Sequence, residues 1–472
     1  MGVGVSSWQL ARAVARTGEL GVVSGTASAV TLARRLALGD PDGCLEDALD
    51  DFPVPAMAQR VRDRYLGTAR DAAGAARFRG LPRPSLDPSS ALTELTVVGN
   101  FVEVRLAKAG HDGPVGINYL EKIQLPTLAS LYGAMLAGVD YVLMGAGVPA
   151  RIPALLDRLA GHEPVAMPVT VADAERGEQT TISFDPGEVT GEVALPPLHR
   201  PRFLAIVSSA TMATFLARNA AGGPDGFVVE TPVAGGHNAP PRGRLRLDAA
   251  GEPVYGPRDE LDLETIAALG LPFWLAGGYA TPEALTAARE AGATGIQVGT
   301  AFAFCEESGL APELKAATVQ AVRERNATVH TDPKASPTGY PFKVLRAAGT
   351  LSEPETYEQR PRLCDVGYLR EPYRRPDGEV GYRCAAEPVE DYVRKGGDPA
   401  DTIGARCLCN ALVANIGLGQ VRRDGYVEPP LVTAGDDVAG LGRFVPPGTN
   451  RYTATDVLDH LLGVGGTQLP GT

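Results

Sequence analysis

Residues 273–300, FWLAGGYATPEALTAAREAGATGIQVGT, contain the pattern that decides the fold. An apolar run at 273–276 ends in a pair of glycines, residues 282–290 read as a helix that opens with proline, and a second apolar run follows at 295–298. Short runs that are apolar throughout are typical of parallel strands, because such strands are buried on both faces. This stretch therefore predicts a strand–helix–strand unit of an α/β protein.

The same alternation extends toward the N-terminus. We predict further strands at residues 20–24, 95–98, 115–119, 141–144, 165–171, 203–208 and 226–230, and a helical segment at 45–78. A closed barrel and a doubly wound sheet both fit this order of elements. No G-x-G-x-x-G motif opens a strand–helix unit, which argues against a dinucleotide-binding sheet. We therefore expect a TIM (β/α)8 barrel over residues 1–325, with an inserted hairpin at about 173–196.

Length, charge and cysteine content narrow the class of protein. The chain has 472 residues, more than the roughly 250 of an α/β barrel, so we expect a smaller, irregular C-terminal domain at 326–472. A net charge of −12 without a basic block argues against nucleic acid and anionic membranes as partners. No apolar stretch is long enough for a membrane span, no secretion leader is evident, and six cysteines do not make a disulfide scaffold. These features predict a cytoplasmic protein that acts on a small molecule.

Glycines follow the last two predicted strands. Gly277 and Gly278 come after the first, and Gly299 and Thr300 come after the second. The active site of a barrel lies where its strands end, and glycines there let backbone N–H groups approach an anion closely. One such turn is more often only a turn. Two in succession, with the hydroxyl of Thr300 as a further donor, predict a phosphate site.

The loop after residues 226–230 carries the strongest candidate for catalysis. In it, Gly235 and Gly236 precede His237. A histidine whose pKa lies near its usual value of about 6.5 can accept a proton at neutral pH. We expect His237 to be catalytic and the two glycines to bring the backbone against a ligand. The alternative is a histidine that only hydrogen-bonds a bound cofactor.

These motifs resemble those of the nitronate monooxygenases, formerly called 2-nitropropane dioxygenases, whose barrel the flavin-dependent enoyl-ACP reductases share. The resemblance is carried by residues 2–6, 21–25, 116–119, 235–237, 276–278 and 295–302. It implies a TIM barrel, FMN as the cofactor, and His237 at the reactive side of the flavin. There the histidine would help to deprotonate a nitroalkane or position its nitronate, and O2 would complete the oxidation to a carbonyl compound and nitrite.

Side chains near residue 120 suit the flavin that the resemblance implies. Asn118 and Gln124 can hydrogen-bond the polar edge of the ring, and Lys122 can offset the negative charge that gathers there on reduction. The alternative for this part of the chain is an ion pair at the barrel rim. Gly25 ends an earlier predicted strand and is expected to contact the flavin as well.

Two features depart from the family's pattern. In relatives a complete strand precedes the segment that matches residues 1–6, so we expect a barrel that is short of its first strand, with unpaired edges. Residues 238–243, NAPPRG, extend the histidine loop and are expected to reshape the substrate mouth.

Four cysteines lie close together in the C-terminal region: Cys364, Cys384, Cys407 and Cys409. Four thiolates are the usual ligand set of structural zinc and of many iron–sulfur clusters. The C-x-C spacing of the last pair is tighter than usual for zinc. The sequence leaves a zinc site, an iron–sulfur cluster and free thiols as alternatives.

The leading hypothesis is an FMN-dependent, nitronate monooxygenase-like enzyme that uses O2 on a small-molecule substrate. The nearest alternative is an NAD(P)H-dependent flavin reductase on the same barrel, acting on an enoyl thioester or a quinone. An alternative of another class is a non-catalytic barrel that acts as an interaction subunit.

Overall fold

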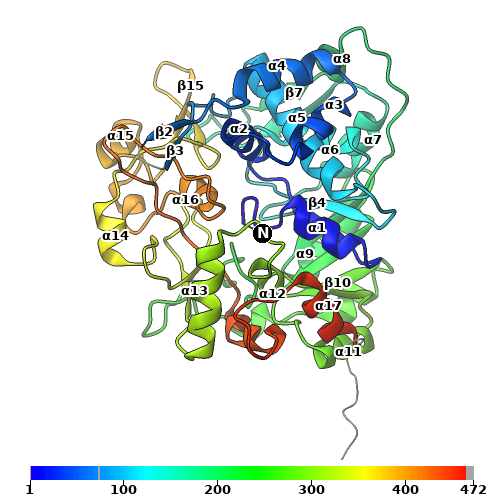
Figure 1. The fold of residues 1–472 in the computed structure, drawn as a ribbon, viewed down its shortest axis with the longest axis vertical. Helices are drawn as coiled ribbons and strands as arrows, with labels where there is room; N and C mark the ends of the chain where they lie inside the picture. The colour runs from blue at the N-terminus through cyan, green and yellow to red at the C-terminus, as the bar shows by residue number, and fades with distance from the viewer. Residues whose placement is uncertain (1, 73–74, 464–472) are drawn as a thin grey trace, which may run out of the picture.

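The computed structural model describes residues 2–72 and 75–463 (Figure 1). Its centre is a curled sheet of seven parallel strands in the order β1-β4-β5-β8-β9-β10-β11. These strands are β1 (Gly21–Ser24), β4 (Val115–Leu120), β5 (Tyr141–Gly145), β8 (Arg202–Val207), β9 (Gly226–Glu230), β10 (Phe273–Ala276) and β11 (Gly295–Gln297). Each neighbouring pair is parallel, as in Leu275 opposite Ile296. The predicted parallel α/β class is therefore confirmed.

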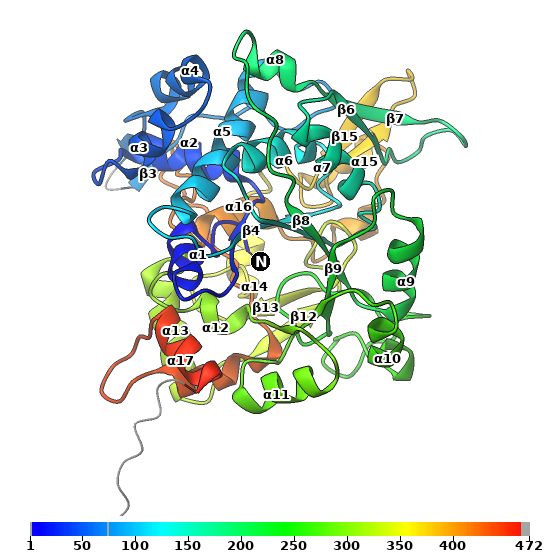
Figure 2. The ribbon, with the colours of Figure 1, turned by 90° about the vertical axis from the view of Figure 1, so that its right-hand side faces the viewer.

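Helices surround the sheet, as two perpendicular views show (Figures 1 and 2). They are α1 (Trp8–Ala15), α2 (Ser28–Leu38), α5 (Ser90–Ala107), α6 (Thr127–Leu136), α7 (Ile152–Ala160), α9 (Ala210–Asn219), α10 (Leu263–Ala267), α11 (Pro282–Glu290), α12 (Thr300–Ala303) and α13 (Pro312–Arg323). Glycine allows three of them to pack closely: a Cβ at Gly133 of α6 would lie 2.1 Å from the carbonyl oxygen of Val97 in α5. On the other flank of α5, a Cβ at Gly99 would lie 2.9 Å from the carbonyl carbon of Ser28 in α2. Helix α5 is consequently buried from both sides.

The strand predicted at residues 95–98 is wrong, because these residues lie inside α5. Leu95, Val97 and Val98 are all fully buried. A helix that is enclosed by other helices needs no polar face, so a short part of its sequence can be almost entirely apolar, as at residues 95–98. Such a run cannot be told from a buried strand by periodicity alone.

Two other predicted elements differ from the structure. The segment at 165–171 is not in the central sheet: β6 (Val165–Val169) pairs antiparallel with β7 (Thr180–Phe184). Burial alternates along both strands, as expected for a hairpin with one exposed face, and the short α8 (Pro186–Thr190) follows. The predicted hairpin therefore begins earlier than residue 173. The segment at 45–78 is only partly helical, with α3 (Cys44–Asp50), α4 (Pro55–Tyr65), β2 (Arg70–Ala72) and β3 (Ala75–Arg77).

The sheet has two ends rather than a closed ring among the described residues. In them β1 pairs only with β4, and β11 only with β10. The chain near residue 6 runs beside the end of β1, where the N–H of Ser24 donates to the carbonyl of Ser6 at 2.9 Å and the hydroxyl of Ser6 donates to the carbonyl of Val22 at 2.5 Å. The expected (β/α)8 barrel is thus seen as a curled seven-stranded sheet.

We call residues 326–463 the C-terminal segment. It contains β12 (Val329–Asp332), β13 (Phe342–Leu345), α14 (Pro354–Gln359), β14 (Glu371–Arg374), β15 (Val380–Arg383), α15 (Val389–Arg394), α16 (Leu408–Ala414) and α17 (Ala454–Leu462), with 3-10 turns at Pro399–Thr402 and Asp436–Phe444. Most of its buried apolar side chains join clusters with the first part of the chain, for example Leu408 with Ile123, and Leu461 with Leu10. Inside the segment, the buried side chains of Arg360 and Glu428 form an ion pair at 2.6 Å.

Among the described helices, none has both the length and the apolar character that crossing a membrane requires.

Candidate functional site

Two adjoining cavities are lined by the central sheet. The smaller lies where strands such as β4, β8 and β9 end, whereas the larger also extends along the sheet to Gly21, which begins β1, and Gly295, which begins β11. The smaller has a volume of about 300 Å³ and the larger of about 450 Å³. Both are within the range of roughly 300–1,000 Å³ that is common for small-ligand sites. They share six lining residues: Gly2, Glu230, Gly235, Gly236, Gln297 and Thr433. One elongated ligand could therefore occupy both cavities.

The larger cavity contains both of the predicted phosphate turns, since Gly277, Gly278, Gly299 and Thr300 all line it. Gly277 has a φ of +90°, and a Cβ there would lie 2.3 Å from the hydroxyl oxygen of Thr231. Only glycine fits such a position without strain. Within residues 2–72 and 75–463, the N–H groups of Gly278, Gly299 and Thr300 donate no hydrogen bond to the backbone. The turns therefore have the free donors that an anion needs.

The C-terminal segment covers these turns. The hydroxyl of Thr300 accepts a hydrogen bond from the N–H of Gly435 at 2.9 Å. Asp437 also lies beside Thr300, and burial raises the pKa of its carboxyl group.

The loop with His237 is held from both sides. In it, the carbonyl of Gly236 accepts from the N–H of Lys343 at 2.9 Å, and the N–H of Gly236 donates to the hydroxyl of Thr433 at 2.8 Å. The N–H of Asn238 donates to the carbonyl of Pro341 at 2.9 Å. All three partners belong to the C-terminal segment. The backbone on each side of His237 is thus fixed by residues that are distant in the sequence.

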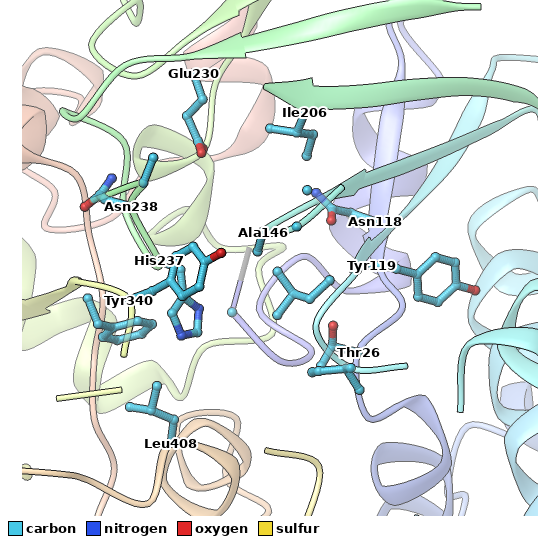
Figure 3. A pocket seen from close by; sticks show the side chains of 18 of the residues that line it. Thr26, Asn118, Tyr119, Ala146, Ile206, Glu230, His237, Asn238, Tyr340 and Leu408 are labelled. Carbon is cyan, nitrogen blue, oxygen red and sulfur yellow. The ribbon is translucent and has the colours of Figure 1, made fainter. Parts of the chain in front are cut away.

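The imidazole of His237 lies in the wall of the smaller cavity (Figure 3). Its Nε2 is 2.7 Å from the hydroxyl oxygen of Ser336, and its ring meets that of Phe342 edge-on at 4.9 Å between centroids. Burial, and next the charge of Lys122, lower the pKa of His237 well below its usual value. The imidazole is therefore neutral at pH 7, as a base must be, but it holds a proton less strongly than a histidine with the usual pKa, which was the expectation from the sequence.

A carboxyl group that the sequence reasoning missed lines the same cavity as this histidine. Glu230 ends β9 and lines both cavities, and its side chain points into the same space as Asn118 and His237 (Figure 3). Burial raises the pKa of Glu230 to about 7. The signal for it was present in the sequence, because it is the polar residue that ends an apolar strand directly before the histidine loop.

Three of the predicted flavin contacts do not line either cavity. The side chain of Gln124 donates to Glu121 at 3.0 Å and accepts from the N–H of Thr170 at 2.9 Å. Gly25 packs against Tyr119, because a Cβ there would lie 2.2 Å from the aromatic ring. Lys122 is half-buried and lines neither cavity. The roles expected for these three residues in flavin binding stay predictions, whereas Asn118 does line the smaller cavity.

The four cysteines of the C-terminal segment surround one small cavity of about 10 Å³: Cys364, Cys384, Cys407 and Cys409. All four are free thiols. Burial raises the pKa of each, that of Cys407 to about 12, so they stay protonated at neutral pH. In the part of the chain that the structure describes, no group of three or more His, Cys, Asp or Glu side chains is arranged to hold a metal ion. The expected zinc or iron–sulfur site is therefore not supported.

Comparison with known proteins confirms the family resemblance. The model of the nitronate monooxygenase family matches residues 169–362 of this chain. This range includes the histidine loop, both phosphate turns and the first strands of the C-terminal segment. The match supports an oxidoreductase of a flavin-dependent class.

One curated relative and two solved structures are also similar to the chain. The relative, (3aS,4S,5R,7aS)-5-hydroxy-7a-methyl-1-oxo-octahydro-1H-indene-4-carboxyl-CoA dehydrogenase of Mycobacterium tuberculosis, is 25% identical over 230 residues, which are 45% of this chain and 60% of the relative. This chain therefore spans less than two thirds of that relative. FabK from Thermotoga maritima is 14% identical with a TM-score of 0.45, over 97% of this chain and 88% of that one. Nitroalkane oxidase from Streptomyces ansochromogenes is 13% identical with a TM-score of 0.46, over 98% and 93%.

Proposed function

We propose that this protein is an FMN-dependent oxidoreductase in which His237 removes a proton from the carbon of a nitroalkane, so that the resulting nitronate can be oxidised with O2. The observation that carries the proposal is the position of His237, a neutral imidazole in the wall of a cavity that continues to two glycine turns.

The residues present fit FMN. The phosphate would be held by the turns at Gly277 and Gly299, where the N–H groups of Gly278, Gly299 and Thr300 donate no hydrogen bond to the backbone of the described residues. The polar groups of Asn118 and Glu230 lie in the cavities toward which a ring would extend. When bound, the flavin would take up the electrons of the substrate and pass them to oxygen.

Residues of this chain would accept the proton of the substrate and hold the substrate in the smaller cavity. His237 is neutral because it is buried, so a C–H acid in the smaller cavity meets a base rather than a cation. Val366, Leu408 and Leu412 form an apolar part of the lining of this cavity. A substrate that displaces water from this part would strengthen the attraction between the base and the developing negative charge.

A second candidate is a reductase that acts on an acyl thioester with NAD(P)H. Two observations favour it: the curated relative is named for a CoA ester, and the apolar side chains of the C-terminal segment leave room for an acyl group in the smaller cavity. The two candidates differ in the compound that delivers electrons to the flavin.

Anaerobic spectroscopy tests the proposal. The purified protein is supplied with FMN and mixed separately with a neutral nitroalkane, a pre-formed nitronate and NADPH. We expect the flavin absorbance to bleach with the nitroalkane and the nitronate. Bleaching by NADPH alone would support the reductase instead, and failure to take up FMN would support the non-catalytic alternative.

The role of His237 is tested by His237→Asn, with His199→Asn at an exposed position as the matched control. His237→Asn should keep FMN bound but slow the reaction with a neutral nitroalkane by a factor on the order of 10²–10⁴. The pre-formed nitronate needs no base and should react at nearly the wild-type rate. Unchanged reaction of the nitroalkane would remove His237 from its proposed role.

A further inference from the structure

A chain of hydrogen bonds leads from His237 to Lys122, a half-buried lysine that does not line either cavity. Nε2 of His237 is 2.7 Å from the hydroxyl oxygen of Ser336, which is 2.8 Å from the hydroxyl oxygen of Thr338. The ammonium nitrogen of Lys122 is in turn 3.3 Å from the Thr338 hydroxyl. Lys122 follows β4, whereas both hydroxyls come from the loop between β12 and β13. Two distant parts of the chain thus form one continuous path.

The surroundings of Lys122 make its charge state variable. Nζ lies 3.5 Å from the ring centroid of Tyr340. Burial lowers the pKa of Lys122 to about 7, while the nearby carboxylate of Glu121 raises it. That carboxylate accepts a hydrogen bond from Gln124. The charged or titratable residues that face Lys122 are therefore Glu121, Tyr340 through the face of its ring and, along the chain of hydroxyls, His237.

The charge of Lys122 biases the direction of the hydrogen bonds in this chain. An ammonium group is only a donor, so Thr338 accepts from it and its own hydroxyl proton is available to Ser336, which then donates to Nε2. In that arrangement neutral His237 carries its proton on Nδ1. A neutral amine can also accept, which allows the chain to run the other way: Thr338 donates to Nζ, Ser336 to Thr338 and Nε2–H to Ser336, and Nδ1 becomes the free base. In the described residues Nδ1 makes no hydrogen bond, so it is the nitrogen left for a ligand.

We propose that Lys122 decides, through Thr338 and Ser336, which nitrogen of His237 can accept a proton, and that Lys122 receives the proton which His237 removes. The proposal rests on the proposed function of His237 as the base. It deepens that function by naming a proton acceptor outside the cavity.

Each proton in the step has a source and a destination. The C–H proton of the substrate moves to Nδ1 of His237, and the electron pair of that bond stays on the substrate. The proton on Nε2 moves to Ser336, the hydroxyl proton of Ser336 moves to Thr338, and that of Thr338 moves to the amine of Lys122. His237 ends neutral, Lys122 ends as an ammonium group, and nothing is oxidised or reduced. Lys122 then returns its proton to solvent.

NMR of the protein labelled with ¹⁵N-histidine tests the chain without any substrate, because ring-nitrogen shifts distinguish the two tautomers. In the wild type, His237 should change from the Nδ1–H to the Nε2–H tautomer as the pH rises through about 7. Lys122→Met and Thr338→Val should each abolish this change. Lys122→Arg keeps its charge and should hold His237 in the Nδ1–H form throughout. Lys334→Met, an exposed lysine on the same loop, should behave as the wild type.

Anaerobic kinetics give the second readout. The rate of reaction with a neutral nitroalkane should rise through about pH 7 in the wild type, and Lys122→Arg should be slower by at least about tenfold above that pH. A wild-type tautomer that does not change with pH, or one that still changes in Lys122→Met, overturns the proposal. If instead His237→Asn reacts normally while the tautomer change depends on Lys122, the proposed function fails and the coupling of the two residues stands.

Discussion

The phosphate turn after β10 provides a quantitative test of the site, through the substitution Gly277→Ala. A Cβ at residue 277 would lie 2.3 Å from the hydroxyl oxygen of Thr231 and 2.9 Å from the amide nitrogen of Ala234. The residue also has a φ of +90°, a left-handed conformation that costs an L-residue about 1–2 kcal/mol. Overpacking adds roughly 1–3 kcal/mol. We therefore expect the free energy of unfolding to fall by about 2–5 kcal/mol.

Gly270→Ala separates the two contributions. Gly270 also has a positive φ, +72°, but a Cβ there meets nothing within 4 Å. It should lose only the conformational part, about 1–2 kcal/mol. The difference between the two variants then measures the steric contact with Thr231 and Ala234.

Urea unfolding of both variants at equal protein concentration, without cofactor, gives the two free energies. The slope of the free energy with urea should be unchanged, which would show that the same surface is exposed on unfolding. Titration with FMN should in addition show weaker binding for Gly277→Ala than for Gly270→Ala. Equal stability and equal FMN affinity in the two variants would refute the described packing of the turn and its role in holding a phosphate.

Two further predictions concern buried charge. Arg360→Met leaves the carboxylate of Glu428 buried without its ion-pair partner at 2.6 Å. The free energy of unfolding, measured with heat or urea, should therefore fall by about 3–5 kcal/mol. The double variant Arg360→Met/Glu428→Leu should recover most of that stability; if it is as unstable as the single variant, the reasoning is wrong. Burial raises the pKa of Glu230 to about 7. Between the ordinary pKa of glutamate and this value, the folded protein therefore binds more protons than the unfolded protein. The free energy of unfolding consequently falls as the pH rises through that range. Glu230→Gln should remove this fall, which is on the order of 1–3 kcal/mol, when unfolding is measured at pH 5 and at pH 8. If the wild type and the variant have parallel pH profiles of stability, the environment of the Glu230 carboxyl group is not as described.

Local sequence patterns predicted those strands, turns and helices whose own residues show a clear preference for that structure. The apolar run at 273–276, its glycines and the proline-led helix after it were all predictable, because strand, turn and helix propensities agree there. The run at 95–98 was misread because burial on every side erases the helical period.

Local patterns also cannot report contacts between distant residues, which explains what was missed in the candidate site. His237 could be selected from its loop, and Glu230 could have been, since both follow one strand. Ser336 could not, because it lies 99 residues from His237 in sequence and only folding of the C-terminal segment brings their side chains together. No periodicity reports a contact over such a distance. The convergence of the four thiols on one small cavity, by contrast, agrees with their grouping as one set in the sequence.

The hydrogen bonds that connect the loop of His237 to the C-terminal segment have a consequence for biosynthesis. Gly236 and Thr433 are bonded across 197 residues, and at a translation rate of about 5–20 residues per second the ribosome needs roughly 10–40 s to make the stretch between them. For roughly the first half of that interval the nascent chain also lacks Pro341 and Lys343, and Thr433 is the last of the three anchors to be made. A chain that stopped before residue 341 would carry every strand of the central sheet but none of these three contacts to the loop with His237. Completion of this loop is therefore a late event in the synthesis of the polypeptide.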